Sequence, residues 1–375
     1  MIKILFNCST NIAGGGVKNS AIFIDYALGS DSEYDWFFLV SPPVYDLLTD
    51  QQKVNPRIEL INKSPAGSNK SRKKVASFAE KHDVEFVYTM AGPAYVNFKI
   101  PHLLGISNPY VTHVKLSDTF KIFGFLKSIS IFLKVCYQFF WSLKGDFFVF
   151  QTDSSRNSFL KRAGIDNKES FVVSNAYDEN RNFSESTRKL DGQTTVLVSG
   201  ADYNHKLQWI LPMVCSELTK LGVNKIKFLV TLRRDSKSWR SIESMAKALG
   251  VDSLIENIGE YKYSEANEVY ASCDMVFVPS VVEVFSATYL EAMQCKKPLI
   301  VADRDFARDI CGDGAEYLEP FDFKATAKAI YLLDQDSDKK NSLIKRASIG
   351  LKDQITQEER FNNLLAVIAS ITPRV

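Results

Sequence analysis

The chain has 375 residues, with 46 Lys and Arg against 44 Asp and Glu, so its formal net charge is only +2. This near balance argues against a general nucleic-acid-binding protein, which usually carries a basic excess over a whole domain. The length is typical of two domains, each large enough to bury its own hydrophobic core.

The six cysteines are widely spaced, and most of them lie in apolar runs. They form no CxxC pair and no metal-ligand spacing, so we expect reduced thiols, no metal site and a cytoplasmic location. The opening residues, MIKILF, are too short for a signal sequence and run directly into a turn. They are predicted to form the first buried strand.

Apolar strands alternate with helical segments along almost the whole chain, a pattern typical of parallel sheets covered by helices. A helix is predicted over residues 17–28, directly after the first strand and its loop. The first sheet is predicted from residues 2–7, 36–40, 86–88 and 147–150. The second is predicted from residues 195–198, 227–230, 255–258, 275–278 and 299–301. The predicted fold class is therefore α/β with two parallel sheets.

A region with little secondary-structure signal separates the two predicted sheets. Residues 178–194 read DENRNFSESTRKLDGQT, which is polar, charged and nearly free of apolar periodicity. Such a composition is typical of a surface linker. We place the domain boundary near Tyr177, so that the first domain covers residues 1–177 and the second covers residues 178–356.

Two carboxylates follow the predicted strand at residues 275–278. Glu283 and Glu291 lie eight positions apart in the stretch PSVVEVFSATYLEAM, and a helix is predicted over residues 285–294. If one regular helix joined them, they would lie roughly 12 Å apart along the axis and about 80° apart around it. Two acceptors at that separation suit the two ends of one extended, hydroxyl-rich ligand.

The start of this predicted helix adds a third feature. The backbone N–H groups of Val284, Phe285 and Ser286 would be free to hold a phosphate between the two carboxylates. A nucleotide sugar has this layout of hydroxyls and phosphate. The alternative is that one exposed helix acid lies near one loop acid with no shared ligand.

The stretch PSVVEVFSATYLEAMQCKKPLIVAD resembles the donor-site signature of retaining glycosyltransferases of the glycosyl transferase group 1 family (family 4). Its pattern is Pro-Ser, two residues, Glu-x-Phe-Gly, then Glu-Ala-Met and Gly-x-Pro. The resemblance implies that Glu283 contacts the donor sugar and Glu291 holds the ribose hydroxyls. It also implies a GT-B fold, with two Rossmann-like domains facing an interdomain cleft and a final helix, residues 357–371, packing back onto the first domain. Ser286 replaces the usual Gly, and Ser allows a less close approach to a phosphate.

A lysine follows the first strand of the second sheet, in the segment SGADYNHKLQW. Lys206 is placed where the family has a Lys that binds the donor diphosphate, and an ammonium there would neutralise charge on the departing nucleotide. Without the resemblance, it reads as an ordinary lysine at a helix start. Ala201 replaces an Arg that the family commonly carries, so Arg233 or Arg234 is the candidate for a compensating cation.

Two glycine-containing turns complete the predicted donor site. Gly15 and Gly16 follow the first strand and match a Gly-Gly-Val stretch that faces the cleft in the family, although a flexible turn is the alternative. The segment Ile258-Gly259-Glu260-Tyr261 resembles the turn whose backbone lies alongside the base, which places Tyr261 next to it. No cofactor is expected, because the nucleotide sugar is itself the substrate.

No convincing general base is visible in the sequence. His113 and the loop around Tyr95 are the candidates for lining the acceptor side, and lone histidines such as His102 are more often structural.

Residues 115–144 form an aromatic and basic insert whose longest uncharged stretch is far too short to span a bilayer. On a helix, Lys127, Ser130, Lys134 and Gln138 would share one narrow polar stripe. The segment is predicted either to lie in the interface of a membrane or to be a core helix with one wet edge. We adopt peripheral contact with the cytoplasmic face of the membrane as the working hypothesis.

The resemblance implies a metal-independent, anomer-retaining hexosyltransferase that moves a sugar from a nucleotide sugar to a hydroxyl acceptor. A glycan or lipid-linked glycan of surface polysaccharide biosynthesis is the expected acceptor. The enzyme alternative is a nucleotide-sugar epimerase on the same fold, which would need acid and base residues that are not evident. The alternative from another class is a non-catalytic, membrane-bound scaffold of a glycan-assembly complex.

Overall fold

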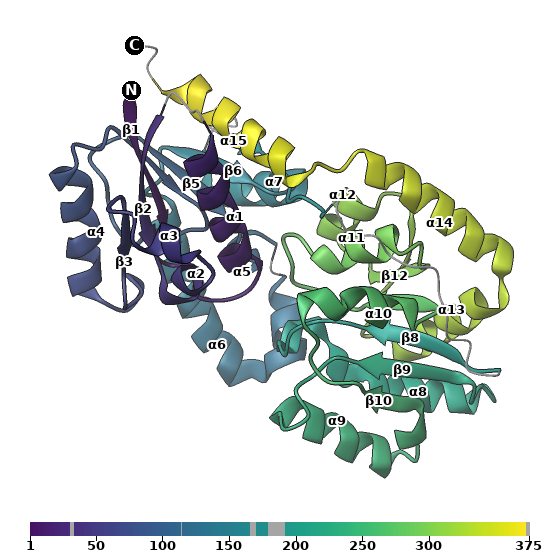
Figure 1. The fold of residues 1–375 in the computed structure, drawn as a ribbon. Helices are drawn as coiled ribbons and strands as arrows, with labels where there is room; N and C mark the ends of the chain where they lie inside the picture. Colours follow the sequence, from purple (N-terminus) through teal and green to yellow (C-terminus); the bar gives the residue numbers. More distant parts are fainter. Residues whose placement is uncertain (31–33, 114, 166–169, 179–191, 373–375) are drawn as a thin grey trace. The chain divides into compact units, whose positions relative to one another are not determined.

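The computed structural model describes residues 1–30, 34–113, 115–165, 170–178 and 192–372. The chain divides into two compact units, each built around one parallel sheet. The first unit comprises Met1–Val114, Phe125–Ala176 and Thr356–Val375, and the second comprises Lys115–Gly124 and Tyr177–Ile355. The predicted α/β class with two parallel-sheet domains is confirmed (Figure 1).

The sheet of the first unit has the strand order β3-β2-β1-β4-β5-β6-β7 in the described residues. Its strands are β1 (Ile2–Cys8), β2 (Tyr34–Val40), β3 (Ile58–Leu60), β4 (Phe86–Thr89), β5 (His102–Ile106), β6 (Phe147–Phe150) and β7 (Ser170–Val172). Its helices are α1 (Gly15–Gly29), α2 (Pro42–Asp46), α3 (Asp50–Lys53), α4 (Asn69–Lys81), α5 (Pro109–Thr112), α7 (Asp153–Ala163) and α15 (Gln357–Ile371).

Successive residues of a strand point to opposite faces of the sheet. The side chains of β1 therefore pack against helices on both faces. Phe6 stacks on Phe23 of α1 at 4.3 Å between ring centroids, and Phe361 of α15 lies 5.2 Å from Phe23. On the other face, Leu5 belongs to the core cluster that contains Phe78 of α4. The last helix of the chain is therefore part of the first unit.

The sheet of the second unit has the order β10-β9-β8-β11-β12-β13 in the part of the chain that is described. Its strands are β8 (Thr194–Val198), β9 (Ile226–Val230), β10 (Ile255–Asn257), β11 (Met275–Val278), β12 (Leu299–Ala302) and β13 (Ala315–Leu318). Its helices are η2 (Asn204–Lys206), η3 (Gln208–Ile210), α8 (Leu211–Lys220), α9 (Lys237–Ala248), η4 (Asp252–Leu254), η5 (Tyr263–Glu265), α10 (Ala266–Ala271), α11 (Ala287–Gln294), α12 (Asp305–Cys311), α13 (Phe323–Gln335) and α14 (Ser337–Lys352).

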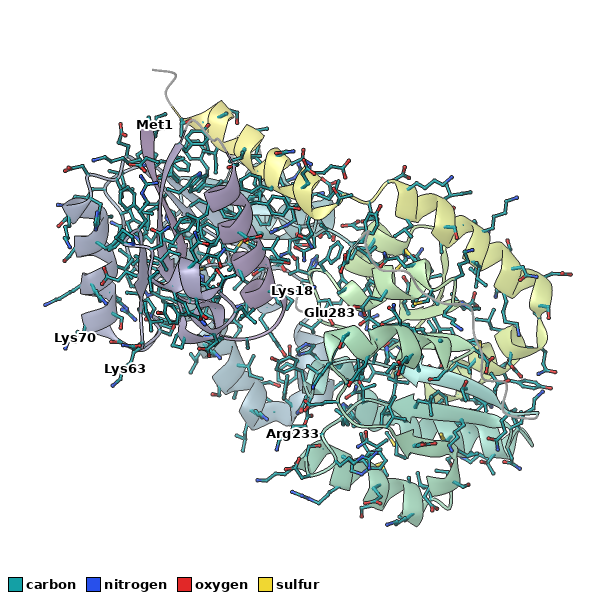
Figure 2. The ribbon with its side chains drawn as sticks, viewed as in Figure 1. Met1, Lys18, Lys63, Lys70, Arg233 and Glu283 are labelled. Carbon is teal, nitrogen blue, oxygen red and sulfur yellow. The ribbon has the colours of Figure 1, made fainter. Side chains whose placement is uncertain are left out.

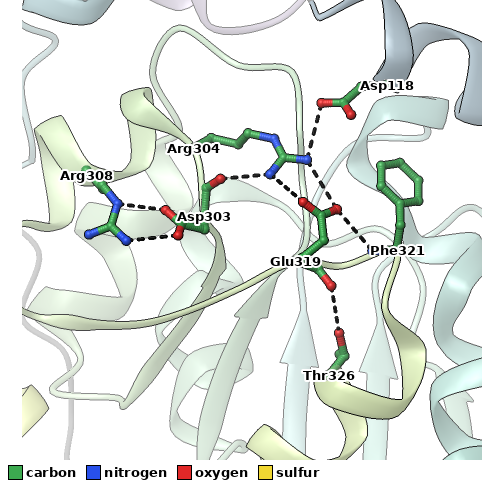
Figure 3. A network of polar contacts seen from close by, with 7 residues as sticks. All are labelled: Asp118, Asp303, Arg304, Arg308, Glu319, Phe321 and Thr326. Carbon is green, nitrogen blue, oxygen red and sulfur yellow. Dashed lines mark hydrogen bonds and ion pairs between the residues drawn. The ribbon is translucent and has the colours of Figure 1, made fainter.

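Helix α6 (Leu116–Ser142) is divided between the two units. It breaks at Gly124, where φ is 70° and ψ is 175°, and the segment Lys115–Gly124 belongs to the second unit. Within that segment Asp118 is buried and forms an ion pair of 3.2 Å with Arg304 (Figure 3). These ten residues therefore lie in the second unit, whereas the sequence predicts all of residues 1–177 in the first domain.

The ion pair has further partners that fix its geometry. Arg304 Nη1 also donates to Glu319 Oε2 at 3.0 Å (Figure 3). In addition, Lys121 Nζ lies 4.6 Å from the centre of the Phe321 ring. Burial lowers the pKa of Arg304, but the hydrogen bond to Glu319 and the charge of Asp118 raise it above its usual value. Arg304 therefore stays charged and attaches the segment Lys115–Gly124 to the second unit.

The predicted linker, the cysteines and the possibility of a membrane-spanning helix can also be compared with the structure. The predicted linker at residues 178–194 lies largely outside the described residues. Among the described cysteines, Cys8, Cys215, Cys273 and Cys311 are buried and Cys136 is exposed. None of the helices in the described part of the chain combines the length and the hydrophobicity needed to cross a membrane.

Candidate functional site

The candidate site lies where the strand order of the second sheet reverses. Strands β8 and β11 are neighbours, whereas the chain continues outward from them in opposite directions, to β9 on one side and to β12 on the other. In open parallel sheets, ligands bind beside the carboxyl ends of the strands at such a reversal. The loops at residues 199–203 and 279–286 both leave from this edge, so the two predicted motifs converge here.

The two loops are joined by charge. Lys206 Nζ forms an ion pair with Glu283 Oε1, and their side chains are only 15% and 11% exposed. Ser280 Oγ donates to the same carboxylate oxygen at 3.0 Å. Figure 2 labels Glu283 on the second unit. Because the pair is largely removed from water, its attraction is less screened than that of a surface pair.

Backbone contacts hold the same two loops together. The carbonyl of His205 accepts a hydrogen bond from the Val281 N–H at 3.3 Å and lies 3.2 Å from Ser280 Oγ. A hydroxyl has one proton, and Ser280 donates it to Glu283, because a carboxylate is a stronger hydrogen-bond acceptor than a carbonyl. Burial lowers the pKa of His205, and the charge of Glu283 opposes that shift. The loops therefore form one connected structure around the ion pair.

Glu291 lies on α11, the helix that directly follows the loop of Glu283. The helix α11 begins at Ala287, two residues later than predicted, because Ser286 is in extended conformation. Glu283 is thus in a loop, and the separation estimated for one regular helix does not apply. Tyr270 OH donates to Glu291 Oε2 at 2.8 Å from a fully buried ring. Burial, followed by the charge of Glu291, raises the pKa of Tyr270 well above its usual value, so the phenol keeps its proton.

The backbone between the two carboxylates has unused donors. Within the described residues, the amides of Val284, Phe285 and Ser286 have no hydrogen-bond acceptor, and Ser286 does not cap the helix with its side chain. Val284 and Ser286 are each 3% exposed. Buried N–H groups without a partner are costly, and a bound anion would satisfy them.

The predicted base-side turn is also built at this edge. Gly259 has φ of +87°, a conformation that favours glycine, and its N–H donates to Asn257 Oδ1 at 3.0 Å. The Tyr261 hydroxyl lies 2.8 Å from Ser199 Oγ. Tyr261 is therefore brought to the loop that follows β8.

The two arginines proposed as the compensating cation have different surroundings. Arg233 is an exposed residue of the second unit (Figure 2). Its guanidinium donates twice to Asp235, at 3.1 and 2.8 Å, and this interaction raises the pKa of Arg233. Arg234 instead places Nε 3.6 Å from the position that a Cβ on Gly259 would take. Arg234 therefore lies against the turn, and the charge of Glu260 in the same turn also acts on Arg233.

The remaining predicted residues belong to the first unit. Gly15 and Gly16 open α1, and the Gly16 carbonyl accepts from Ser20 Oγ at 2.7 Å. His113 ends α5, and its N–H donates to Pro109 O at 2.9 Å. Tyr95 is 6% exposed and packs against an aromatic cluster, with its ring 5.8 Å from that of Tyr137.

Three residues that support the site, Ser280, Asn257 and Tyr270, are not among the predicted site residues. Ser280 is the second residue of the stretch PSVVEVFSATYLEAM, so its nearness to Glu283 in the sequence was a signal of this contact. Asn257 bonds both Gly259 N–H and, at 3.2 Å, Leu232 N–H, and an Asn beside a Gly turn is a weak signal of this role. Tyr270 gave no signal, because its contact with Glu291 joins two different helices. No cluster able to hold a metal ion occurs among the described His, Cys, Asp and Glu residues.

The second unit matches a known family of sequences. Residues 179–349 match the family model described as "Glycosyl transferases group 1". The O-antigen chain mannosyltransferase RfbU of Salmonella typhimurium is 24% identical over 183 residues. That match covers 49% of this chain and 49% of RfbU, so the chain spans about half the length of this relative.

Solved structures support the fold over nearly the whole chain. Anabaena HepE in complex with UDP and glucose has a TM-score of 0.73 at 15% identity, covering 99% of this chain and 100% of that one. The lipopolysaccharide outer core galactosyltransferase WaaB has a TM-score of 0.67 at 13% identity, with coverages of 99% and 100%. Both likenesses show the GT-B fold. Residues 179–349 are therefore similar in sequence to the glycosyl transferases group 1 family.

Proposed function

We propose that the chain is a retaining, metal-independent glycosyltransferase that moves a hexose from a nucleotide sugar to a hydroxyl of a glycan acceptor. The observation that carries this proposal is the largely buried Lys206–Glu283 pair at the sheet reversal, with Glu291 on the helix that follows. These groups supply one cation and two separate carboxylates at the edge where such sheets bind ligands.

Each group has a role in the proposed reaction. The Lys206 ammonium and the amides of Val284, Phe285 and Ser286 would hold the donor diphosphate and stabilise the negative charge that grows on it as the glycosidic bond breaks. Glu283, already oriented by Ser280, would accept hydroxyls of the donor sugar. Glu291 would accept the ribose hydroxyls in the orientation that Tyr270 gives it.

The relatives support this substrate class. HepE has been solved with UDP, with UDP and glucose, and with UDP-glucose. RfbU is described as an O-antigen chain transferase and WaaB as a lipopolysaccharide core transferase, which favours an acceptor from surface polysaccharide assembly. A lipid-linked glycan is the form of that acceptor we propose.

A donor screen tests the first half of the proposal. Binding to the folded state alone raises apparent thermal stability, so a panel of nucleotide sugars should contain at least one that raises the melting temperature. The Glu291→Ala variant should lose that shift, whereas Glu268→Ala, an exposed acid on α10, should keep it. A panel without any stabilising member, including the free nucleoside diphosphates, would favour the scaffold alternative.

A turnover assay tests the second half. Free nucleoside diphosphate should form at a rate that depends on added acceptor, and a chelator should not change that rate. Conversion of the donor to its sugar epimer without acceptor would instead identify an epimerase. The anomeric configuration of the product, read from its proton coupling constants, should match that of the donor, and an inverted product would contradict the retaining mechanism.

A further inference from the structure

The second half of α6, residues 125–142, carries an apolar face on the outside of the first unit. Leu126 is 83% exposed, Phe125 is 68% exposed and Leu133 is 64% exposed. Other large apolar residues of this face or just beyond it are also exposed: Ile129, Phe132, Tyr137, Phe140 and Leu143. Residues 125, 129, 132, 133, 136 and 140 share one side of a helix, so these side chains form a continuous surface.

The opposite side of the same helix is turned inward and is partly polar. Ser128 is 4% exposed and Ser142 is 1% exposed. Gln138 Oε1 accepts a hydrogen bond from Asn108 Nδ2 at 3.0 Å. Gln138 therefore faces inward. Of the predicted polar stripe, Lys127, Ser130 and Lys134 are exposed to solvent, whereas Gln138 is partly buried. The usual amphipathic arrangement, with apolar residues inward, is thus partly reversed.

Positive charge accompanies the apolar face. The sequence from residue 119 to residue 145 contains no Asp or Glu, and Lys127 and Lys134 are exposed within it. A second acid-free stretch, residues 61–79, carries exposed Lys63, Lys70 and Lys73.

Arg72 brings these two stretches together. Its Nη2 donates to Tyr137 OH at 2.6 Å, and its guanidinium lies 5.2 Å from the ring centre of Trp141. Figure 2 shows Lys63 and Lys70 at the end of the first unit where α4 begins, with their side chains directed away from the ribbon. The basic stretch therefore lies beside the exposed apolar helix.

We propose that residues 125–142 lie in the interface of an anionic lipid bilayer, with their apolar face among the acyl chains and the lysines of both stretches against the headgroups. Apolar area and positive charge together are what such binding requires. A second copy of this chain fits less well, because it would bring the same positive charge to the contact. The segment predicted to contact the membrane is residues 115–144. The proposed contact is limited to residues 125–142, because Lys115–Gly124 belongs to the second unit.

Co-sedimentation of the full chain with lipid vesicles tests this surface. The chain should sediment with vesicles of phosphatidylcholine mixed with phosphatidylglycerol, and the triple variant Phe125→Ser, Leu126→Ser, Leu133→Ser should lose about tenfold or more in partitioning. All three side chains are exposed, so their replacement should not unfold the protein. The matched control replaces three exposed apolar residues elsewhere by Ser, namely Val54, Leu332 and Ile349, and should bind as the wild type does.

The charge component has its own variant. Lys63→Gln, Lys70→Gln, Lys73→Gln should weaken binding to the anionic vesicles several-fold and should flatten its dependence on salt. Vesicles of phosphatidylcholine alone should bind the wild type weakly, and binding equal to that of the anionic vesicles would overturn the assignment of anionic lipid.

Two results would overturn the whole surface proposal. One is equal vesicle binding by the wild type and the triple serine variant. The other is a wild-type dimer, measured by sedimentation without vesicles, that dissociates in the triple variant while neither form binds lipid; this outcome would assign the face to a second copy. The assays need neither donor nor acceptor, so their failure is distinguishable from failure of the proposed activity.

Discussion

The substitution Asp118→Ala tests how the segment Lys115–Gly124 is held in the second unit. Asp118 is 4% exposed and pairs with Arg304, which is 8% exposed, at 3.2 Å. Removing one partner of a buried ion pair costs about 3–5 kcal/mol, because the other charge remains buried without compensation. Here Glu319, half-exposed, stays within 3.0 Å of the guanidinium and retains part of the compensation. We therefore expect a loss of about 2 kcal/mol.

Thermal unfolding followed by calorimetry measures this loss. For a domain of this size, about 2 kcal/mol corresponds to a decrease of roughly 4–8 °C in the melting temperature of the transition that includes the second unit. Asp313→Ala removes an exposed acid near the end of α12 and should change stability by less than about 0.5 kcal/mol. In a double-mutant cycle, Arg304→Met should make the effect of Asp118→Ala much smaller. Equal stability of Asp118→Ala and the wild type, or strict additivity in the cycle, would refute the reasoning.

The other predictions concern single contacts. Tyr270→Phe removes the donor that orients Glu291 and should weaken donor binding about fivefold in titration calorimetry; unchanged affinity would show that Glu291 needs no such support. Burial lowers the pKa of His102 from 6.5 to about 4, so the unfolded chain takes up the proton first. About 3 kcal/mol of stability should then be lost as the pH falls from about 6.5 to about 4, and a His102→Leu variant with the same pH dependence in urea unfolding would contradict this. Gly259→Ala should cost about 1–2 kcal/mol because φ is +87°, and no loss of melting temperature would mean that the turn relaxes.

The sheets were predictable because parallel strands buried on both faces read as short, continuous apolar runs. The strands β3, β5, β7 and β13 were missed, since each mixes polar residues or glycine with apolar ones, as in IEL, HLLGI, SFV and AEYL. A strand at the edge of a sheet does not need a wholly apolar sequence, and neither does a strand whose buried polar side chain has a hydrogen-bond partner. His102 illustrates this, because its Nε2 lies 2.8 Å from Thr89 Oγ1 within the first sheet.

The candidate site was predictable only as far as its residues follow strands. Lys206 and Glu283 each lie shortly after a strand of the same sheet, so the reversal of strand order explains why they meet. The contacts of Tyr270 with Glu291 and of Asp118 with Arg304 depend on tertiary packing between separate helices and loops, which no local pattern encodes.

The most direct test of the donor site is titration calorimetry with the nucleotide sugar that stabilises the chain most. Lys206→Met removes the charge proposed to hold the diphosphate and should weaken binding at least about tenfold, because a charge-assisted contact to phosphate is lost. Its circular dichroism should remain that of the wild type, and Glu268→Ala should bind normally. Equal affinity of Lys206→Met and the wild type for that donor would contradict the assignment of the site.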